Sequence, residues 1–196
     1  MISKSQLWVK RIFDVAIVML FLPLLVLPIL LLIFIATIDT KKWGVYSQLR
    51  VGQYGKLFRI YKIRTLTDGE HRLGQLDCSA SSVGRFLRRT KLNELPQLYN
   101  VLIGDMSFVG PRPDLQGFAD ELVGRDRIIL KVKPGITGPA SLKYKHEEEE
   151  LKCQNDPEHY NRTIIWVDKV KINKKYVQNY SFYLDLTLIV KSILNK

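Results

Sequence analysis

The chain has 196 residues, of which 46% are hydrophobic and 25% are charged, and it carries a formal net charge of +11. This length suits one domain of ordinary size with an appended segment, and it argues against two full domains. The positive charge predicts an anionic partner, which could be nucleic acid, a lipid headgroup or a phosphorylated substrate. Cys78 and Cys153 lie far apart in the sequence, so neither a zinc site nor a disulfide framework is suggested, and a reducing cytoplasm is the expected setting.

An apolar stretch without a single charge runs from Val15 to Ala36. At about 1.5 Å per residue, a helix of this length could cross a bilayer core of about 30 Å. A cleavable signal peptide is less favoured, because the apolar run is longer than the core of such peptides and no small-residue cleavage site follows it. The stretch is therefore interpreted as a membrane segment.

Two prolines, Pro23 and Pro28, interrupt this segment near its middle, and basic residues flank both of its ends. We expect a re-entrant helical hairpin or a sharply kinked helix that dips into one leaflet, breaks at the prolines and returns to the cytoplasmic face. A proline-kinked single span is the alternative. Residues 1–40 would form this membrane-dipping hairpin, and residues 41–196 would form the cytoplasmic domain.

Residues 45–49 and 58–63 form two short runs on either side of a turn that contains Gly52 and Gly55. This pattern predicts a β-hairpin. Lys62 and Arg64 would point to the same face of an extended strand, where they could together bind a diphosphate. A solvated strand edge protected by charge is the alternative for the same two residues.

The segment from Val83 to Thr90 places Arg85, Arg88 and Arg89 on one face of a predicted helix. Such a face can bind phosphate or lie against anionic lipid, and a merely solvated face explains the pattern equally well.

Apolar residues at helical spacing, followed by Gly104, predict a helix from about Asn93 to Ile103. Asn93 would be its N-cap, and Glu94 would lie at the positive end of the helix dipole, which favours an ionised carboxylate that can hold a divalent cation. The alternative is that both residues are ordinary helix punctuation without any chemical role.

Arg112 lies between Pro111 and Pro113, in the sequence Gly110-Pro111-Arg112-Pro113. A residue before proline is confined to extended conformations, so the guanidinium is presented from a stiff backbone. Rigid placement of an arginine suits a phosphate clamp.

The C-terminal half is less informative. Residues 131–139 predict a loop stiffened by proline and glycine, which either contacts the substrate or connects structural elements. Four successive glutamates, at 147–150, favour a solvated helix start over a metal site. Residues 181–194 show helical spacing of apolar side chains and predict an amphipathic helix on the membrane or against the core. The overall fold class is α+β, with a mostly helical domain, one short β-hairpin and interfacial amphipathic helices.

Taken together, six short motifs make the chain resemble the bacterial sugar transferases, specifically the small monotopic phosphoglycosyl transferases. The motifs follow the family's order and are Lys10-Arg11-Ile12-Phe13-Asp14, Tyr61-Lys62-Ile63-Arg64-Thr65, Asn93-Glu94-Leu95-Pro96-Gln97, Gly104-Asp105-Met106-Ser107, Val109-Gly110-Pro111-Arg112-Pro113 and Lys133-Pro134-Gly135-Ile136-Thr137-Gly138-Pro139.

The resemblance implies an enzyme at the cytoplasmic face of the bacterial inner membrane that transfers a sugar-1-phosphate from a UDP-sugar to undecaprenyl phosphate and releases UMP. This is the first membrane step of bacterial glycoconjugate assembly. It also implies Mg²⁺ held by Glu94, catalytic roles for positions 93 and 94, and contact with inner membrane lipids. The chemistry agrees, because phosphoryl transfer needs charge neutralisation, which Lys62, Arg64, Arg88 and Arg112 would supply. A homodimer is left open, and no nucleic-acid signature is present.

One position departs from the family pattern. Members commonly carry an aspartate, thought to attack the β-phosphate, where this chain has Asn93. An amide is a poor nucleophile, because its nitrogen lone pair is delocalised and its oxygen is uncharged. Three explanations stay open: another carboxylate such as Glu94 or Asp105 attacks, the transfer is direct, or the asparagine is a substitution that disables the enzyme. A catalytically impaired relative, or a non-enzymatic basic membrane-anchored module that binds anions, is therefore the alternative function.

Overall fold

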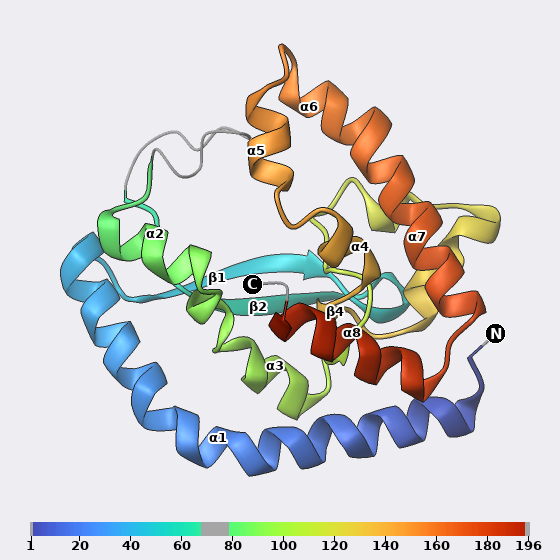
Figure 1. Cartoon of the computed structure of the whole chain (residues 1–196), viewed down its shortest axis with the longest axis horizontal. Helices are drawn as coiled ribbons and strands as arrows, with labels where there is room; N and C mark the ends of the chain where they lie inside the picture. The colour runs from blue at the N-terminus through green and yellow to red at the C-terminus, as the bar shows by residue number, and fades with distance from the viewer. Residues whose placement is uncertain (1, 68–78, 195–196) are drawn as a thin grey trace.

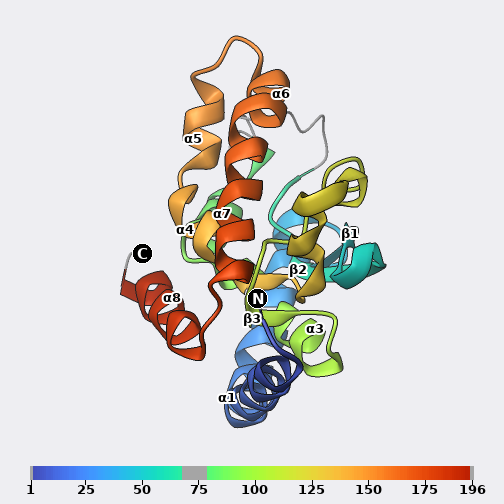
Figure 2. The same ribbon diagram turned by 90° about the vertical axis from the view of Figure 1, so that its right-hand side faces the viewer.

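A computed structural model describes residues 2–67 and 79–194 of the chain. One long helix, α1 (Lys4–Thr40), runs along one edge of the molecule and bends so that its second arm rises beside the remaining elements (Figure 1). Seen from the end of the molecule, the rest of the chain lies on one side of α1, with α3 and α8 next to it (Figure 2).

Helix α1 begins with a capping box, in which Ser3 and Gln6 each accept a hydrogen bond from the backbone N–H of the other. The helix continues through Pro23 and Pro28 and ends at Thr40, where Lys41 adopts a left-handed conformation. A proline inside a helix removes one backbone hydrogen bond and clashes with the preceding turn, which accounts for a bend at this part of α1. Of the two expected forms, the structure has the kinked helix and not two helices joined by a turn.

Both arms of α1 contact the same body of the protein. In the first arm, Arg11 donates to the carbonyl oxygens of Val101 and Leu102, at 2.5 and 2.8 Å. In the second arm, the fully buried Ala36 packs with Ile63 and Leu87. Outward-facing residues between the arms are strongly exposed, including Leu24 at 70% and Leu27 at 76%.

The predicted β-hairpin is present. Strands β1 (Val45–Val51) and β2 (Leu57–Ile63) pair antiparallel with Val45 opposite Ile63, and a 3-10 turn, Gln53–Gly55, joins them. The next element is α2 (Ser82–Arg89), whose N-cap Ser81 accepts a hydrogen bond from Gly84 N.

The predicted helix at 93–103 is divided. A 3-10 turn spans Leu92–Glu94, and α3 begins only at Gln97 and ends at Ile103. Asn93 is therefore not the N-cap of α3, a position that Pro96 occupies, and Glu94 lies before the helix instead of in its first turn. The physical reason is Pro96, which has no N–H for an i→i−4 bond, so that the backbone bonds here run between residues three apart, as from Leu98 N to Leu95 O at 3.0 Å.

A second, parallel pair consists of β3 (Ser107–Val109) and β4 (Gly135–Thr137). The remaining described elements lie between and after these strands: the 3-10 segments Ala119–Glu121 and Gly124–Lys131, α4 (Pro139–Lys143), α5 (Glu147–Lys152), α6 (Pro157–Tyr160), the π-helical turn Asn161–Ile165, α7 (Trp166–Gln178) and α8 (Phe182–Leu194). This mixture of many helices with small sheets agrees with the predicted α+β class.

Helix α8 is held to α1 by a buried polar cluster. Lys10 forms an ion pair with Asp185, whose carboxylate also accepts hydrogen bonds from Tyr176 at 2.6 Å and Tyr180 at 3.2 Å. Because every member of the cluster has a partner, the buried charges are compensated. The apolar side chains that predicted an amphipathic helix here face outward, with Tyr183 exposed at 80%.

Candidate functional site

A cavity of about 650 Å³ opens between the β-hairpin, the segment that follows β3, and helices α5 to α7. The sequence-predicted residues that line it are Lys62, Arg64, Arg88, Asn93 and Arg112. These residues come from four separate elements of the chain, so the fold gathers the predicted cations and the predicted catalytic position around one space.

Glu94 is buried and does not line this cavity itself, but it contacts two residues that do. Its Oε1 atom accepts hydrogen bonds from Lys62 Nζ at 3.0 Å and from Arg112 NH2 at 2.6 Å. One carboxylate oxygen thus connects a cation from β2 with the cation from the Pro-Arg-Pro segment. Glu94 fixes the positions of both cations at the cavity wall.

Burial and the neighbouring charges shift the pKa values of Glu94 and Lys62. Burial alone would raise the pKa of Glu94, but the neighbouring charges of Arg112 and Lys62 outweigh burial, and the pKa lies well below its ordinary value. Burial lowers the pKa of Lys62 to about 8, although Glu94 opposes that shift. Glu94 is therefore ionised at neutral pH, and Lys62 is predominantly protonated.

Asn93 is also buried, with 8% of its surface exposed, and it lines the cavity. Its side-chain oxygen accepts no hydrogen bond from any residue that the structure describes. Buried polar atoms normally have a partner, so an orphaned oxygen at a cavity wall is a characteristic of positions that meet a ligand.

The backbone that carries Arg112 is braced from behind by residues 133–138. Gly110 N donates to Thr137 O at 2.9 Å, and Gly135 N donates to Pro111 O at 2.8 Å. The contact is so close that a Cβ atom on Gly110 would lie 2.4 Å from Lys133 O. The segment predicted as a loop at 131–139 therefore contains strand β4 instead, and it supports the backbone before Arg112 because its glycines permit two backbones to touch.

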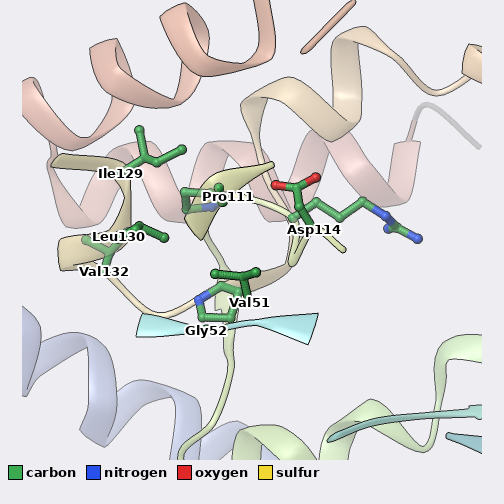
Figure 3. A pocket seen from close by; sticks show the side chains of 10 residues that line it. Val51, Gly52, Pro111, Asp114, Ile129, Leu130 and Val132 are labelled. Carbon is green, nitrogen blue, oxygen red and sulfur yellow. The ribbon is translucent and has the colours of Figure 1, made fainter. Parts of the chain in front are cut away.

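An apolar cluster supports the same segment on its other side. Pro111 faces Val51, Ile129 and Leu130 around a cavity of about 20 Å³. Ile129 and Leu130 lie on one side of Pro111, and Asp114 lies on the other (Figure 3). Contacts on two sides therefore immobilise the backbone of Arg112, as the flanking prolines predict.

Sequence reasoning missed one wall of the cavity. Tyr46, Gln48 and Arg50 from β1 line it together with Lys62 from the neighbouring strand, and Tyr46 is paired directly with Lys62. A signal was present, because residues 46, 48 and 50 are two apart and share one face of a strand. On the neighbouring strand, Lys62 continues this face opposite Tyr46, whereas Ile60 and Phe58 lie opposite Gln48 and Arg50.

Carboxyl groups also line the cavity where none was expected. Burial raises the pKa of Asp114 to about 7, against the opposing charges of Lys169, Arg50 and Arg112. Glu147 pairs with Lys169 Nζ at 2.7 Å. The predicted helix start at the four glutamates is confirmed, because α5 begins at Glu147, but Glu147 itself is partly buried and belongs to the cavity wall.

Two of the predicted residues, Arg64 and Asp105, are less directly available to a ligand in the cavity. Arg64 donates from Nε to Trp43 O at 2.9 Å and lies over the Tyr46 ring, so part of its hydrogen-bonding capacity is already used. Asp105, named as a substitute nucleophile, follows the C-terminal end of α3 and does not line the cavity.

Comparisons with known proteins show the family of the chain. The model of the bacterial sugar transferase family matches residues 5–196. The uncharacterized sugar transferase EpsL of Bacillus subtilis (strain 168) is 33% identical over 187 residues, which cover 94% of this chain and 85% of that protein.

Two further relatives have named activities. A UDP-glucose:undecaprenyl-phosphate glucose-1-phosphate transferase of Klebsiella pneumoniae is 34% identical over 194 residues, covering 94% of this chain and 39% of its own length. An undecaprenyl-phosphate galactose phosphotransferase of Salmonella typhimurium is 29% identical over 214 residues, covering 97% and 40%. The chain thus spans about two fifths of the length of these two proteins. With the family match extending over nearly its whole length, the chain belongs to the bacterial sugar transferase family.

Proposed function

We propose that this protein transfers a sugar-1-phosphate from a UDP-sugar to undecaprenyl phosphate and releases UMP. The observation that carries the proposal is the cavity in which Glu94 holds Lys62 and Arg112, with Asn93 and Arg88 in the same wall. Several cations around one ionised carboxylate form a suitable site for a diphosphate. The names of the Klebsiella and Salmonella relatives support undecaprenyl phosphate as the acceptor.

The reaction joins an oxygen of the lipid phosphate to the β-phosphorus of the nucleotide sugar and breaks the bond between that phosphorus and the bridging oxygen. The bridging oxygen leaves with UMP. Such a transfer depends on positioning and charge neutralisation, which the paired Lys62 and Arg112 provide. Arg64 and Arg88 supply further positive charge to the same cavity.

The site also fits Mg²⁺. Magnesium is commonly bound by one or two carboxylates together with substrate phosphates, and it prefers oxygen ligands. Glu94 is ionised, its Oε1 atom is engaged by cations, and the orphaned oxygen of Asn93 is beside it in sequence and in the cavity wall. Glu94 and Asn93 would hold the ion, which when bound neutralises developing phosphate charge. Among the described residues no group of three or more acidic, histidine or cysteine side chains converges, so the substrate would have to supply ligands.

The contacts of α1 support a monotopic arrangement at the cytoplasmic face of the inner membrane. Within the described chain, α1 is the one helix long and apolar enough to cross a bilayer. Residues in both of its arms nevertheless contact the same body, through Arg11 at one end and Ala36 at the other. A straight span would separate these ends by the thickness of the membrane. A bent helix immersed in one leaflet keeps both contacts, and the exposed apolar face of α8 would rest on the same surface.

The decisive experiment is a UMP-release assay over a panel of UDP-sugars with undecaprenyl phosphate and Mg²⁺, on the full chain in detergent. The proposal expects release with at least one sugar, and loss of release when a chelator removes the metal. UDP binding without turnover for any sugar would instead indicate a catalytically impaired relative. Asn93 would be the expected cause of the impairment, because an amide is a poor nucleophile. Absence of both turnover and UDP binding, in protein that unfolds cooperatively, would contradict the proposal.

A further inference from the structure

A second cavity, of about 720 Å³, lies at the end of the molecule where α1 begins, the end that Figure 2 faces. It is bounded by the start of α1, the 3-10 segment Gly124–Lys131, the hairpin turn and the end of α7. It shares no lining residue with the catalytic cavity. Nothing in the proposed transfer reaction uses it.

The charge of this cavity is of one sign. Four cations line it, namely Lys4, Arg125, Arg127 and Lys131, and no carboxylate does. Lys4, Arg125 and Lys131 form no ion pair with any described carboxylate. Arg127 donates to the backbone oxygens of Asp120 and Leu122, at 3.3 and 3.1 Å, so its guanidinium is positioned without being neutralised.

Apolar side chains line the cavity beside the cations, and they include residues at the start of α1. Ile2 and Leu7 line it while packing against the core, and the next residue, Trp8, is 69% exposed. Tryptophan at the end of an apolar helix is typical of the headgroup level of a bilayer. An anion that enters this cavity could therefore carry an acyl chain along Leu7 onto the outer face of α1.

We infer that this cavity binds the headgroup phosphate of an anionic phospholipid of the bulk membrane, such as phosphatidylglycerol. Clustered Lys and Arg beside a membrane helix recognise anionic headgroups, and apolar lining residues select a lipid over a free anion. The acceptor phosphate is excluded as occupant by function, because it must reach Asn93 and Glu94 in the other cavity. The bound lipid would hold the start of α1 at the membrane surface. The inference rests on the proposed placement of α1 in the membrane.

The test uses the full chain in a neutral detergent, titrated with short-chain phosphatidylglycerol while the thermal unfolding midpoint is followed. The expected result is a saturable rise in the midpoint, with no rise for short-chain phosphatidylcholine and only weak binding of inorganic phosphate. The double variant R125Q/K131Q should bind phosphatidylglycerol about 30-fold more weakly. The charge-preserving R125K/K131R should retain binding, which separates lost charge from misfolding.

The matched control is K152Q/K171Q, which removes the same charge from exposed positions outside the cavity and should bind as the unchanged chain does. Equal binding of phosphatidylcholine, or full phosphatidylglycerol binding by R125Q/K131Q, would overturn the inference. So would inorganic phosphate binding as tightly as the lipid, or a polyprenyl phosphate displacing it with higher affinity. UMP release in neutral detergent, measured on the same samples, should be equal in R125Q/K131Q and the unchanged chain. Absence of UMP release with intact lipid binding would refute only the proposed transfer.

Discussion

At the scale of single residues, the chemistry of the site depends on whether position 93 can attack phosphorus. The structure places Asn93 in the cavity wall beside Glu94, with its side-chain oxygen unpartnered among the described residues. An amide oxygen there can orient a ligand, but it lacks the charge of a nucleophile. If the proposed transfer uses position 93, the residue lies in the cavity wall but carries a side chain that is poorly suited to attack.

We expect Asn93→Asp to raise UMP release by at least about 100-fold, the lower range of what a catalytic group contributes. The change replaces an amide by a carboxylate of nearly the same shape, so the cavity should keep its structure. The measurement is the initial rate of UMP release under saturating substrates. Asp105→Asn, outside the cavity, is the control and should leave the rate unchanged. An equal or lower rate in Asn93→Asp would favour direct transfer or attack by another carboxylate.

Asp114 gives the site a pH dependence. In the folded protein its pKa is about 7, above the ordinary value of 3.8, so the folded state favours the protonated form. The corresponding stability is fully present below about pH 3.8 and is lost as the pH rises through about 7. Asp114→Asn should remove this component, so that the variant loses less stability than the unchanged chain between pH 5 and 7.5. The unfolding midpoint across this range measures it, and parallel curves would contradict the assignment.

At the scale of elements, two short segments distant in the sequence form one support for Arg112. The strand pair β3 and β4 aligns the Gly-Pro-Arg-Pro segment with residues 133–138, and the two backbones exchange hydrogen bonds across glycines. Prolines restrict the segment locally, and this packing fixes where it lies. Both are needed to hold a guanidinium at 2.6 Å from Glu94.

Gly110→Ala tests this support. The added Cβ would lie 2.4 Å from Lys133 O and 3.0 Å from Gly135 N, both backbone atoms that cannot turn aside. We expect a loss of about 1–3 kcal/mol in unfolding free energy, the usual cost of overpacking, together with reduced UMP release because Arg112 moves. Gly124→Asn is the control, since Gly124 has open space around it and its left-handed conformation suits asparagine. An unchanged unfolding midpoint and rate in Gly110→Ala would show that the segment tolerates displacement.

At the scale of the whole molecule, the bend in α1 carries the proposed placement of the cavity at one face of the membrane. Cysteines introduced at Ser5 and at Lys42, in a chain lacking Cys78 and Cys153, should both react with an impermeant reagent from the cytoplasmic side. The physical reason is that both arms of α1 contact one body, through Arg11 and Ala36. Labelling from inverted and right-side-out vesicles measures this. If the two positions react from opposite sides, α1 spans the bilayer and the monotopic arrangement is wrong.

The sequence by itself determined the features that depend on neighbours along the chain. The apolar length of α1 with its two prolines, the glycine turn of the β-hairpin and the stiff Pro-Arg-Pro segment are all local, so composition along the chain and backbone restriction predicted them. The order of the short motifs identified the family. The predicted helix start at Asn93 was wrong, because Pro96 cannot donate a backbone hydrogen bond and α3 begins only at Gln97.

Only the tertiary structure decided which side chains share a space. Lys62 and Arg112 meet on one oxygen of Glu94, Arg50 and Asp114 join the same cavity, and Asp105 lies outside it. No pattern along the chain contains these distances, because they result from how the hairpin, the braced segment and α7 pack together. The shifted pKa values of Glu94, Lys62 and Asp114 depend on the same packing, since burial and neighbouring charge exist only once these elements are assembled.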